Sequence, residues 1–472
     1  MHVANFTLVI HTKLKGFDMN DETKTASPEH EHLGMGKNLT YGFQHVLTMY
    51  GGLIAAPLVV GLGIGLSQAD IGLLITASIL VAGLATLLQT LGFKWFGSKL
   101  PIVQGTSFAA VASMIAIGSN GGSFQAILGA IMVSSIFGII IAPFFSKIVR
   151  FFPPIVTGSI IAIIGISLLP VAIRWMMGGN NKAPDWGSVE NISLALLTLG
   201  IVIILNMLPQ ASIRRLSILL AIVAGTTLAY FMGFGDFSQV SSGAWLQFPH
   251  LFAFGLPTFE LSAILSMLIV TLVIMTETTA DIIAVGDIVG TQVDSKRIAN
   301  GVRADMFSSA IAPIFGSFMQ SAFAQNVGLV AITGIKSRFV VAAGGVILII
   351  LGLLPVMGRL IAAIPMPVLG GAGLVLFGSV AASGIRTLAK IDYNDQKNLI
   401  IVATALSAGM IPIINHEFYA HFPVWVQTLF HSGISSTCIF AILLNLLFNH
   451  LPSFRSSRTP HLSQTINTRN TH

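Results

Sequence analysis

Apolar runs about as long as a lipid bilayer is thick recur along the whole chain, with few charged residues inside them. A helix of about 20 apolar residues crosses the hydrocarbon core of a bilayer, which is about 30 Å thick. Only 9% of the 472 residues are Asp, Glu, Lys or Arg, and the mean hydropathy is +0.84. So few charges cannot cover a water-soluble surface. The sequence therefore predicts an all-α integral membrane protein.

The apolar runs predict fourteen membrane-spanning segments, of which the third, ninth and tenth are shorter than a full crossing. Helices are expected because backbone polar groups inside a bilayer must find their partners within the protein. The expected ranges are 42–62, 70–92, 108–118, 121–144, 152–173, 191–208, 215–234, 261–284, 300–316, 326–335, 338–357, 366–385, 398–415 and 432–449.

The basic residues orient these segments. If both termini are cytoplasmic, only Arg174, Lys182 and Arg359 of the 24 Lys and Arg residues fall on the outside. This distribution is the one that the positive-inside rule requires. We therefore expect a multi-pass protein of the cell membrane with both termini in the cytoplasm.

The transporter domain is expected to cover residues 39–450, between cytoplasmic tails at 1–38 and 451–472. The N-terminal tail is polar overall and is expected to have no fold of its own. Basic residues occur singly or in pairs along the chain, so nucleic acid is not expected to be a partner. The lipid bilayer is expected to surround the chain.

Two stretches of the chain resemble each other, PPIVTGSIIAIIG and MPVLGGAGLVLFG. Any two membrane helices can share a few glycines, but the match fits a chain divided into two halves of seven spans. A repeat with an odd number of spans must have its second copy inverted. Inverted repeats are typical of transporters whose substrate site lies near the middle of the membrane. At one constant offset, Pro154, Gly158 and Gly165 match Pro367, Gly371 and Gly378.

The third and tenth spans are each too short to cross a bilayer as a helix, so each is expected to be a half-helix preceded by a short strand. Extended backbone at membrane depth is tolerated where it lines a cavity. Two such half-helices would direct their N–H groups toward a shared site. Alternatively, the polar residues there only satisfy loose backbone; they are Gln104, Thr106, Ser107, Gln325 and Asn326.

Four acids fall within or beside apolar spans: Glu277, Asp281, Asp287 and Asp305. An ionisable group in a span is costly and is a functional candidate by default. Glu277 and Asp281 are four residues apart and share one face of the eighth span. The alternative is a structural pair or, for Asp287 near the cytoplasmic end, a capping acid. His45 in the first span could equally be a packing residue.

The tenth span contains QNVGLVAITG, which resembles the signature of the nucleobase–ascorbate transporters, also called nucleobase:cation symporter family 2. The matching residues are Gln325, Asn326, Gly328, Thr333 and Gly334. The Gln44–His45 pair and the ETTAD run at 277–281 are also features of this family. The resemblance covers about residues 39–450.

The resemblance implies a proton-coupled purine carrier and assigns roles to individual residues. Glu277 and Gln325 would hydrogen-bond the purine, Phe108 would stack on its ring, and the backbone near Ser107 would assist; Asn326 belongs to the same substrate-binding motif. Asp305 and Asp281 would serve proton coupling, and His45 would add a supporting hydrogen bond. Gln44, Gly328, Thr333 and Gly334 would be structural.

The resemblance also implies two intertwined seven-helix repeats divided into a core and a gate domain. The core would contain spans 1–4 and 8–11, at about 39–145 and 261–357. The gate would contain spans 5–7 and 12–14, at about 152–234 and 366–450, and a homodimer through the gate is expected. No cofactor and no metal are expected, because the proton gradient supplies the driving force.

Substrate choice follows from Gln325 and Ser107. Glutamine at the start of the motif resembles the xanthine and uric acid carriers, and the small hydroxyl of Ser107 resembles those that accept uric acid. We expect uric acid and xanthine together, then xanthine alone, then uracil or another nucleobase. An anion or ascorbate carrier of the same fold is disfavoured by Glu277. A membrane enzyme is disfavoured because the sequence contains no nucleophile motif and no metal-ligand spacing.

Overall fold

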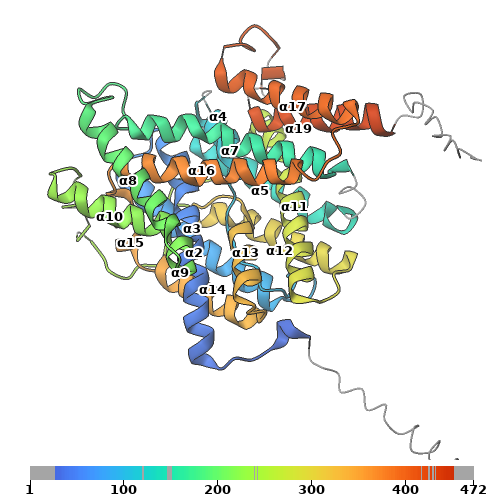
Figure 1. Ribbon diagram of the computed structural model, residues 1–472, viewed down its shortest axis with the longest axis horizontal. Helices are drawn as coiled ribbons and strands as arrows, with labels where there is room; N and C mark the ends of the chain where they lie inside the picture. The colour runs from blue at the N-terminus through green and yellow to red at the C-terminus, as the bar shows by residue number, and fades with distance from the viewer. Residues whose placement is uncertain are drawn as a thin grey trace, which may run out of the picture.

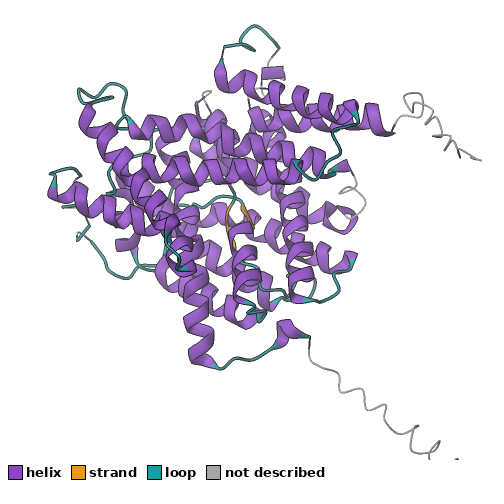
Figure 2. Cartoon of the chain, viewed as in Figure 1, coloured by secondary structure: helices purple, strands orange, loops and turns teal. Residues whose placement is uncertain are grey.

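The computed structural model describes residues 27–450 except 120–121, 146–150, 236, 239, 242, 416, 424–425, 428–429 and 431. Residues 1–26 of the expected N-terminal tail and the whole expected C-terminal tail lie outside this part. Within the described residues the chain is helical apart from two short strands and the connecting loops (Figures 1 and 2).

The α-helices in the first part of the chain are α2 (Met35–Gly63), α3 (Gln68–Leu91), α4 (Val111–Ser119), α5 (Phe124–Ile141), α7 (Pro154–Met176), α8 (Val189–Met207), α9 (Ala211–Arg215) and α10 (Ser217–Phe231). The second part contains α11 (Leu261–Val289), α12 (Ser295–Ile311), α13 (Ala324–Thr333), α14 (Arg338–Gly352), α15 (Pro355–Ala362), α16 (Met366–Leu388), α17 (Gln396–Ile414) and α19 (Gly433–Asn445). Single turns of 3₁₀-helix include η1 (Pro28–His30), η2 (Phe108–Ala110), η3 (Ala142–Phe144) and η5 (Ala312–Phe315), and η6 (Leu446–His450) is a π-helix.

Eight of the described helices are long and apolar enough to cross a membrane, or nine if the bent pair α14–α15 is one span. Four further apolar helices are shorter: Phe108–Gly118, Ser217–Phe231, Ala324–Thr333 and Gly433–Asn449. Each of the fourteen expected ranges overlaps a helix. Length and composition do not establish fourteen crossings, so that number stays a prediction.

Several helix ends follow from capping residues. Ser67, Ser123 and Asp294 each accept a hydrogen bond from a backbone N–H in the first turn of the helix that follows. Such caps satisfy N–H groups that have no partner inside the helix. Gly290 ends α11 and Gly334 ends α13, both with a positive φ that favours glycine.

The two strands lie at the centre of the molecule (Figure 2). β1 (Gln104–Thr106) and β2 (Gln320–Ala322) pair antiparallel, with Gln104 opposite Ala322, and all six residues are buried. β1 leads into η2 and α4, and β2 leads into α13. The strands and the short helices after them are therefore present where the sequence predicts half-helices.

The helices form two sets of close neighbours. α14 packs against α2 and α3, and α5 packs against α11 and α12. α7 packs against α16, α17 and α19, and α16 also contacts α8. In Figure 1, α7 and α16 lie side by side, with α14, α13 and α12 in the opposite part of the molecule.

The closest helix pair is α7 with α16, the two helices that carry the expected repeat. A Cβ on Gly165 would collide with the backbone of Ala381, and a Cβ on Gly384 would collide with that of Ala162. A Cβ on Gly158 would lie 2.9 Å from the Leu388 side chain, whereas a Cβ on Gly378 would meet nothing within 4 Å. The matched glycines therefore do not all serve the same packing role, and the inverted repeat stays a prediction.

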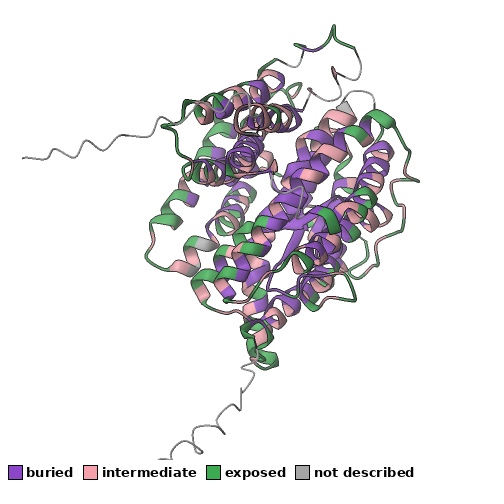
Figure 3. Cartoon of the chain, turned by 90° about the vertical axis from the view of Figure 1, so that its right-hand side faces the viewer, coloured by how far each residue is buried: buried purple, intermediate pink, exposed green. Residues whose placement is uncertain are grey.

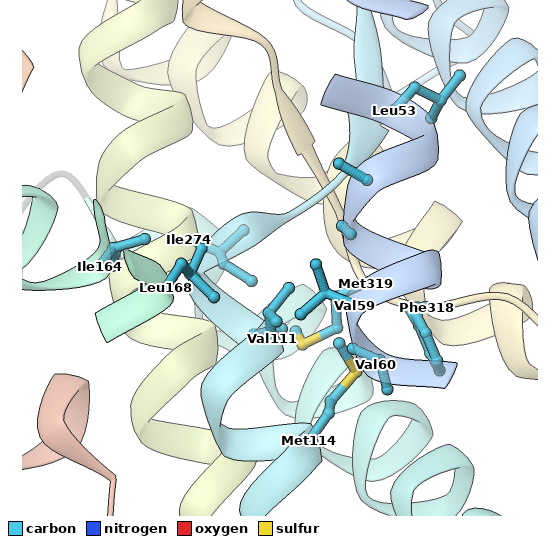
Figure 4. Packing of buried hydrophobic residues seen from close by; sticks show 14 of the residues in the cluster. Leu53, Val59, Val60, Val111, Met114, Ile164, Leu168, Ile274, Phe318 and Met319 are labelled. Carbon is cyan, nitrogen blue, oxygen red and sulfur yellow. The ribbon is translucent and has the colours of Figure 1, made fainter. Parts of the chain in front are cut away.

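Buried apolar side chains run through the interior, and exposed positions lie mainly on the outer faces of helices (Figure 3). Figure 4 shows the core where α2, α4 and α7 meet α11 and the segment leading into β2. Large apolar side chains are exposed on other helices: Ile204 of α8 is 60% exposed and Phe231 of α10 is 79% exposed. Such exposure suits a surface in contact with lipid.

Residues 28–38 differ from the expectation of an unfolded tail. η1 is docked through Glu29, which is 2% exposed and forms an ion pair with Arg297 at 2.9 Å. Ser337 Oγ donates to the backbone oxygen of Glu31 at 2.6 Å, and α2 already begins at Met35. Glu29 is the one buried residue of this segment, and the others are exposed or half-buried.

Candidate functional site

A cavity of about 830 Å³ lies where α11 and α13 face α7 and α16. η2, which follows β1, and the end of β2 also line it. Pockets that bind small molecules are commonly about 300–1,000 Å³ and combine apolar walls with a few polar groups. The cavity fits that description.

One wall of the cavity is a single face of α11. Glu277, Asp281 and Ala284 line it, at the spacing of successive helical turns. Both residues are half-buried, and both line the cavity. The structure therefore brings together the two acids that the sequence predicts to share a helix face. Asp287 is exposed and does not line this cavity.

The facing wall comes from the start of α13. Gln325 and Gly328 line the cavity, and a Cβ on Gly328 would meet nothing within 4 Å. Gln325 also lines a second cavity of about 230 Å³ bounded by α2, α10 and α16. Gln325 thus lies at the boundary between the two cavities, together with Ser379 of α16.

An aromatic ring also lines the cavity. Phe108 lines it and meets Phe377 of α16 edge-on, with ring centroids 6.1 Å apart. Ser107 is 1% exposed and does not reach the cavity; its Oγ accepts from Ala109 N at 3.3 Å and its N–H donates to Met319 O at 2.8 Å. Ser107 therefore fixes the backbone on which Phe108 is presented.

Asn326 and His45 pair with each other. Asn326 Nδ2 donates to His45 O at 3.0 Å and lies 3.1 Å from His45 Nδ1. Both residues are buried, and neither lines the cavity. Gln44, next to His45, is partly buried, and its carbonyl accepts from Thr48 Oγ1 at 2.9 Å. These contacts join the first span to the start of α13.

The end of α13 explains the last residues of the signature. Thr333 Oγ1 donates to Leu329 O at 2.8 Å and accepts from Ile335 N at 3.3 Å. Gly334 has φ +68° and ends the helix with a hydrogen bond from its N–H to Val330 O. Only glycine adopts this conformation without strain.

Asp305 lies behind the strands. It is 0% exposed, and its Oδ2 accepts a hydrogen bond from the Thr278 hydroxyl. Its Oδ1 has no hydrogen-bond partner among the described residues. The structure therefore separates Asp305 from the cavity, unlike Glu277 and Asp281.

Gln104 and Thr106 of β1 are both 0% exposed, and their side-chain polar atoms have no partner among the described residues. They point to neither cavity. No group of three or more His, Cys, Asp or Glu side chains suited to a metal ion occurs in the described part of the chain.

Sequence reasoning missed three features of the site. Thr278 lies within the ETTAD run but was not singled out. A Cβ on Gly105 would lie 2.5 Å from the Phe323 ring and a Cβ on Gly52 would lie 3.0 Å from it, so both glycines leave room for this ring. Arg386, in the last turn of α16, and Lys390, two residues after that helix, also line the cavity, although the sequence indicated only their cytoplasmic side.

The sequence matches the family model Xan_ur_permease, described as a permease family, over residues 36–418. The chain belongs to this family. The expected membership of the nucleobase–ascorbate transporters is thereby confirmed, and the protein is a permease rather than an enzyme.

Relatives within this permease family are similar over most of their length. The xanthine permease of Bacillus subtilis (strain 168) is 41% identical over 88% of this chain and 94% of that protein. The uric acid permease PucK of the same organism is 41% identical over 86% of this chain and 94% of that protein. The uric acid transporter UacT of Escherichia coli (strain K12) is 37% identical over 88% of this chain and 87% of that protein.

Solved structures of other transporters share the fold. The transmembrane domain of the cyanobacterial bicarbonate transporter BicA has a TM-score of 0.58 at 16% identity, covering 87% of this chain and 97% of that domain. The murine anion transporter Slc26a9 in its inward-facing state also gives 0.58, at 13% identity, covering 89% of this chain and 70% of that protein. At these identities the likeness concerns the fold alone.

Proposed function

We propose that this permease is a proton-coupled symporter that carries the oxopurines xanthine and uric acid into the cell. The observation that carries the proposal is the meeting of Glu277, Gln325 and Phe108 at one cavity, from α11, α13 and η2. These three elements are distant in sequence, yet each presents a group that suits an oxopurine.

The chemistry of the three side chains supports this substrate class. A glutamine amide has two donors and an acceptor, so Gln325 can match adjacent C=O and N–H groups on the ring. An ionised Glu277 accepts from ring N–H groups in charge-assisted hydrogen bonds. Phe108 offers an aromatic face or edge for the purine. The names of the relatives, xanthine permease and uric acid permease, favour the same substrates over uracil.

We assign Asp305 and Asp281 to proton coupling, because intramembrane carboxyls are costly and are commonly functional. His45 and Asn326 support the site by fixing the start of α13, so that Asn326 acts on the substrate through its neighbour Gln325. No metal or organic cofactor enters this proposal.

The architecture that we propose has fourteen spans in two inverted seven-span repeats, with both termini cytoplasmic and cell-membrane localisation. The antiparallel pairing of β1 with β2 supports it, as two inverted half-helices would meet in this way. The two sets of neighbouring helices support a core domain at 39–145 and 261–357 and a gate domain at 152–234 and 366–450. A homodimer through the gate completes the proposal.

The proposal is tested by uptake of labelled xanthine into cells that express the protein. We expect uric acid to compete strongly, uracil and hypoxanthine weakly, and a protonophore to abolish accumulation. Uracil competing as well as uric acid would replace our substrate assignment by the uracil alternative. Accumulation that survives the protonophore would contradict proton coupling.

Glu277→Gln in the same assay tests the site. It keeps the size of the side chain but loses the charge-assisted acceptor, worth about 1.5–3 kcal/mol, so xanthine uptake should fall about tenfold or more. The matched control is Glu190→Gln, which changes an exposed glutamate in the first turn of α8 and should leave uptake unchanged. Normal uptake by a well-expressed Glu277→Gln protein would refute the assignment of Glu277.

A further inference from the structure

Thr278 forms hydrogen bonds to two elements at once. Its hydroxyl donates to Asp305 Oδ2 of α12, and its Oγ1 accepts from the N–H of Ala322 in β2 at 3.4 Å. Thr278 is 0% exposed, so these contacts are shielded from water. A single side chain of α11 therefore joins a buried carboxyl to the backbone of a central strand.

Thr278 is unusual among the buried threonines of its helix. Thr271, Thr276 and Thr279 each donate to the carbonyl oxygen four residues earlier in α11. This is the ordinary partner of a threonine hydroxyl inside a helix. Thr278 donates across to Asp305 instead. The hydroxyl therefore has two available partners, the carboxylate and its own helix.

The ionisation of Asp305 decides between these partners. An ionised carboxylate only accepts hydrogen bonds, so the Thr278 hydroxyl must donate to it. When a proton binds at Oδ2 on the side of Thr278, that oxygen becomes the donor and Thr278 Oγ1 accepts from it. The Thr278 hydrogen then turns to another acceptor, and Oγ1 shares its lone pairs between Asp305 and Ala322 N–H. Proton binding at Asp305 thus changes the bond that holds β2.

β2 leads directly to the substrate site. Ala322 lines the large cavity, and Gln325 follows it by three residues. Phe323 N–H donates to Val103 O at 3.1 Å, so a shift of β2 is passed on to the segment before β1 as well. On the other side, Thr278 directly follows Glu277, which also lines the cavity.

We propose that Thr278 is a positioning residue that transmits the protonation of Asp305 to strand β2 and the substrate site. The inference rests on the proposed role of Asp305 in proton coupling. No proton passes through Thr278. The proton binds to Asp305 and leaves from Asp305, and the threonine hydroxyl only changes from donor to acceptor in its hydrogen bond with that carboxyl group.

Other charged groups near Asp305 are few. α12 packs against α3, α5, α11, β2, η3 and η5. Among the described residues of these elements, α5, β2, η3 and η5 carry no titratable group, and α3 carries only Asp70 in its first turn. α11 carries Glu277, Asp281 and Asp287, and α12 itself carries Lys296, Arg297 and Arg303. Asp281 is the acid that interacts with Asp305 through its charge.

The experiment measures the affinity of the purified full-length protein for labelled xanthine in acidic and neutral buffer. Coupling between two ligands is reciprocal, so protons and xanthine must change each other's affinity. We expect the affinity of the wild type to change about fivefold or more between the two buffers. Thr278→Val, which removes the hydroxyl at nearly constant volume, should bind xanthine with little response to pH. Thr278→Ser, which keeps the hydroxyl, should restore the response.

Two control variants distinguish transmission of the protonation state of Asp305 from a purely structural role of a buried hydroxyl. Ser309 Oγ donates to Asp305 O at 2.8 Å and accepts from Gln320 N at 2.8 Å, so it also ties α12 to β2 but does not touch the carboxyl group. Ser309→Ala should lower stability or affinity equally in both buffers. Thr271→Val, which removes a buried hydroxyl bonded within α11, should behave as the wild type.

A wild-type pH response retained in Thr278→Val would overturn the role of Thr278 and leave proton coupling intact. A response lost in Thr278→Ser would overturn it as well, because the hydroxyl is still present. A wild type without a pH response and with protonophore-resistant accumulation would instead refute proton coupling itself. If Thr278→Val does not reach the membrane, Thr278→Ala replaces it with the same expected outcome.

Discussion

At the scale of single residues, Gln325 is the side chain whose chemistry bears most directly on selectivity. It lies at the boundary of two cavities and faces the wall of α11 that carries Glu277. Glu277 can only accept hydrogen bonds when ionised, whereas Gln325 both donates and accepts. The pair therefore offers complementary groups to a ring with alternating C=O and N–H positions.

Gln325→Glu tests this complementarity. An ionised glutamate would place a second acceptor opposite a purine carbonyl and leave buried polar groups unpaired, at a cost of about 1–3 kcal/mol. We expect xanthine and uric acid affinity to fall about five- to 150-fold, with the protein still folded in the membrane. Gln325→Asn should weaken uptake or alter selectivity because it withdraws the amide by one methylene.

The measurement is labelled-purine uptake at matched membrane abundance, with Gln396→Glu as the control. Gln396 is exposed at the start of α17, where a negative charge is tolerated. Unchanged affinities for both purines in Gln325→Glu would mean that Gln325 does not contact the substrate.

Some residues of the site can be recognised from the sequence, whereas the contacts of others appear only in the folded structure. Glu277, Gln325 and Phe108 lie in short motifs, so their importance is visible locally. The partner of Asp305 cannot be recognised locally, because Thr278 lies on another helix and reaches Asp305 only after α11 and α12 pack. Ser107 and Asn326 were expected near the substrate, but hydrogen bonds to the backbone and to His45 place their side chains beside the cavity wall.

At the scale of elements, the docking of η1 shows where composition misleads. Residues 28–38 are polar and resemble an unfolded tail, yet Arg297 binds this segment through Glu29 and holds the loop before β1 through Ser98 O at 2.7 Å. These partners come from distant parts of the chain. By contrast, the half-helices were predictable, because a run too short to cross a bilayer and rich in Gly and polar residues is visible in the sequence.

The Glu29–Arg297 ion pair makes the stability of this face depend on pH. Burial opposes ionisation of Glu29, but hydrogen bonds from its own backbone, Arg297 and Thr291 and the Arg297 charge outweigh it and lower the pKa below the usual 4.5. A carboxyl whose pKa is lower in the folded state stabilises it above the unfolded pKa, and this contribution is lost as the pH falls through the folded pKa. The affected range therefore lies below about pH 5.

Glu29→Gln should lower the free energy of unfolding by about 1–3 kcal/mol at neutral pH and by less in acid. Thermal unfolding of the purified protein in detergent at two pH values measures the difference. Glu31→Gln is the control, since Glu31 is exposed and makes its contact to Ser337 through the backbone. Equal losses for Glu29→Gln at both pH values would contradict the ionic origin of the effect.

At the scale of the whole molecule, the large cavity indicates which side of the membrane the site faces. Its lining includes Arg386 and Lys390, which the positive-inside rule places in the cytoplasm. Lys182, in the loop between α7 and α8, is expected on the opposite side. The topology depends on how many times the chain crosses the membrane between these positions. Length and composition alone identify eight described helices that could cross, or nine if the bent pair is one span.

Cysteine labelling tests this topology, because Cys438 is the one cysteine of the chain and is 3% exposed. In a Cys438→Ser background, a membrane-impermeant thiol reagent added to intact cells should label Lys182→Cys and not Lys390→Cys. A permeant reagent should label both, since both positions are exposed. Labelling of Lys390→Cys by the impermeant reagent would place the cavity on the outer side and reverse the proposed orientation.

The pairing of β1 with β2 also constrains when the protein can finish folding. Chains are synthesised from the N-terminus at about 5–20 residues per second, so Gln104 is made long before its partner Ala322. Until β2 arrives, β1 exposes backbone groups that lack partners at the depth of the bilayer. We therefore expect that the N-terminal half does not fold independently and that the substrate site is completed only after most of the chain has been synthesised. Fragments that end before β2 should be recognised by the cell as unfinished and degraded.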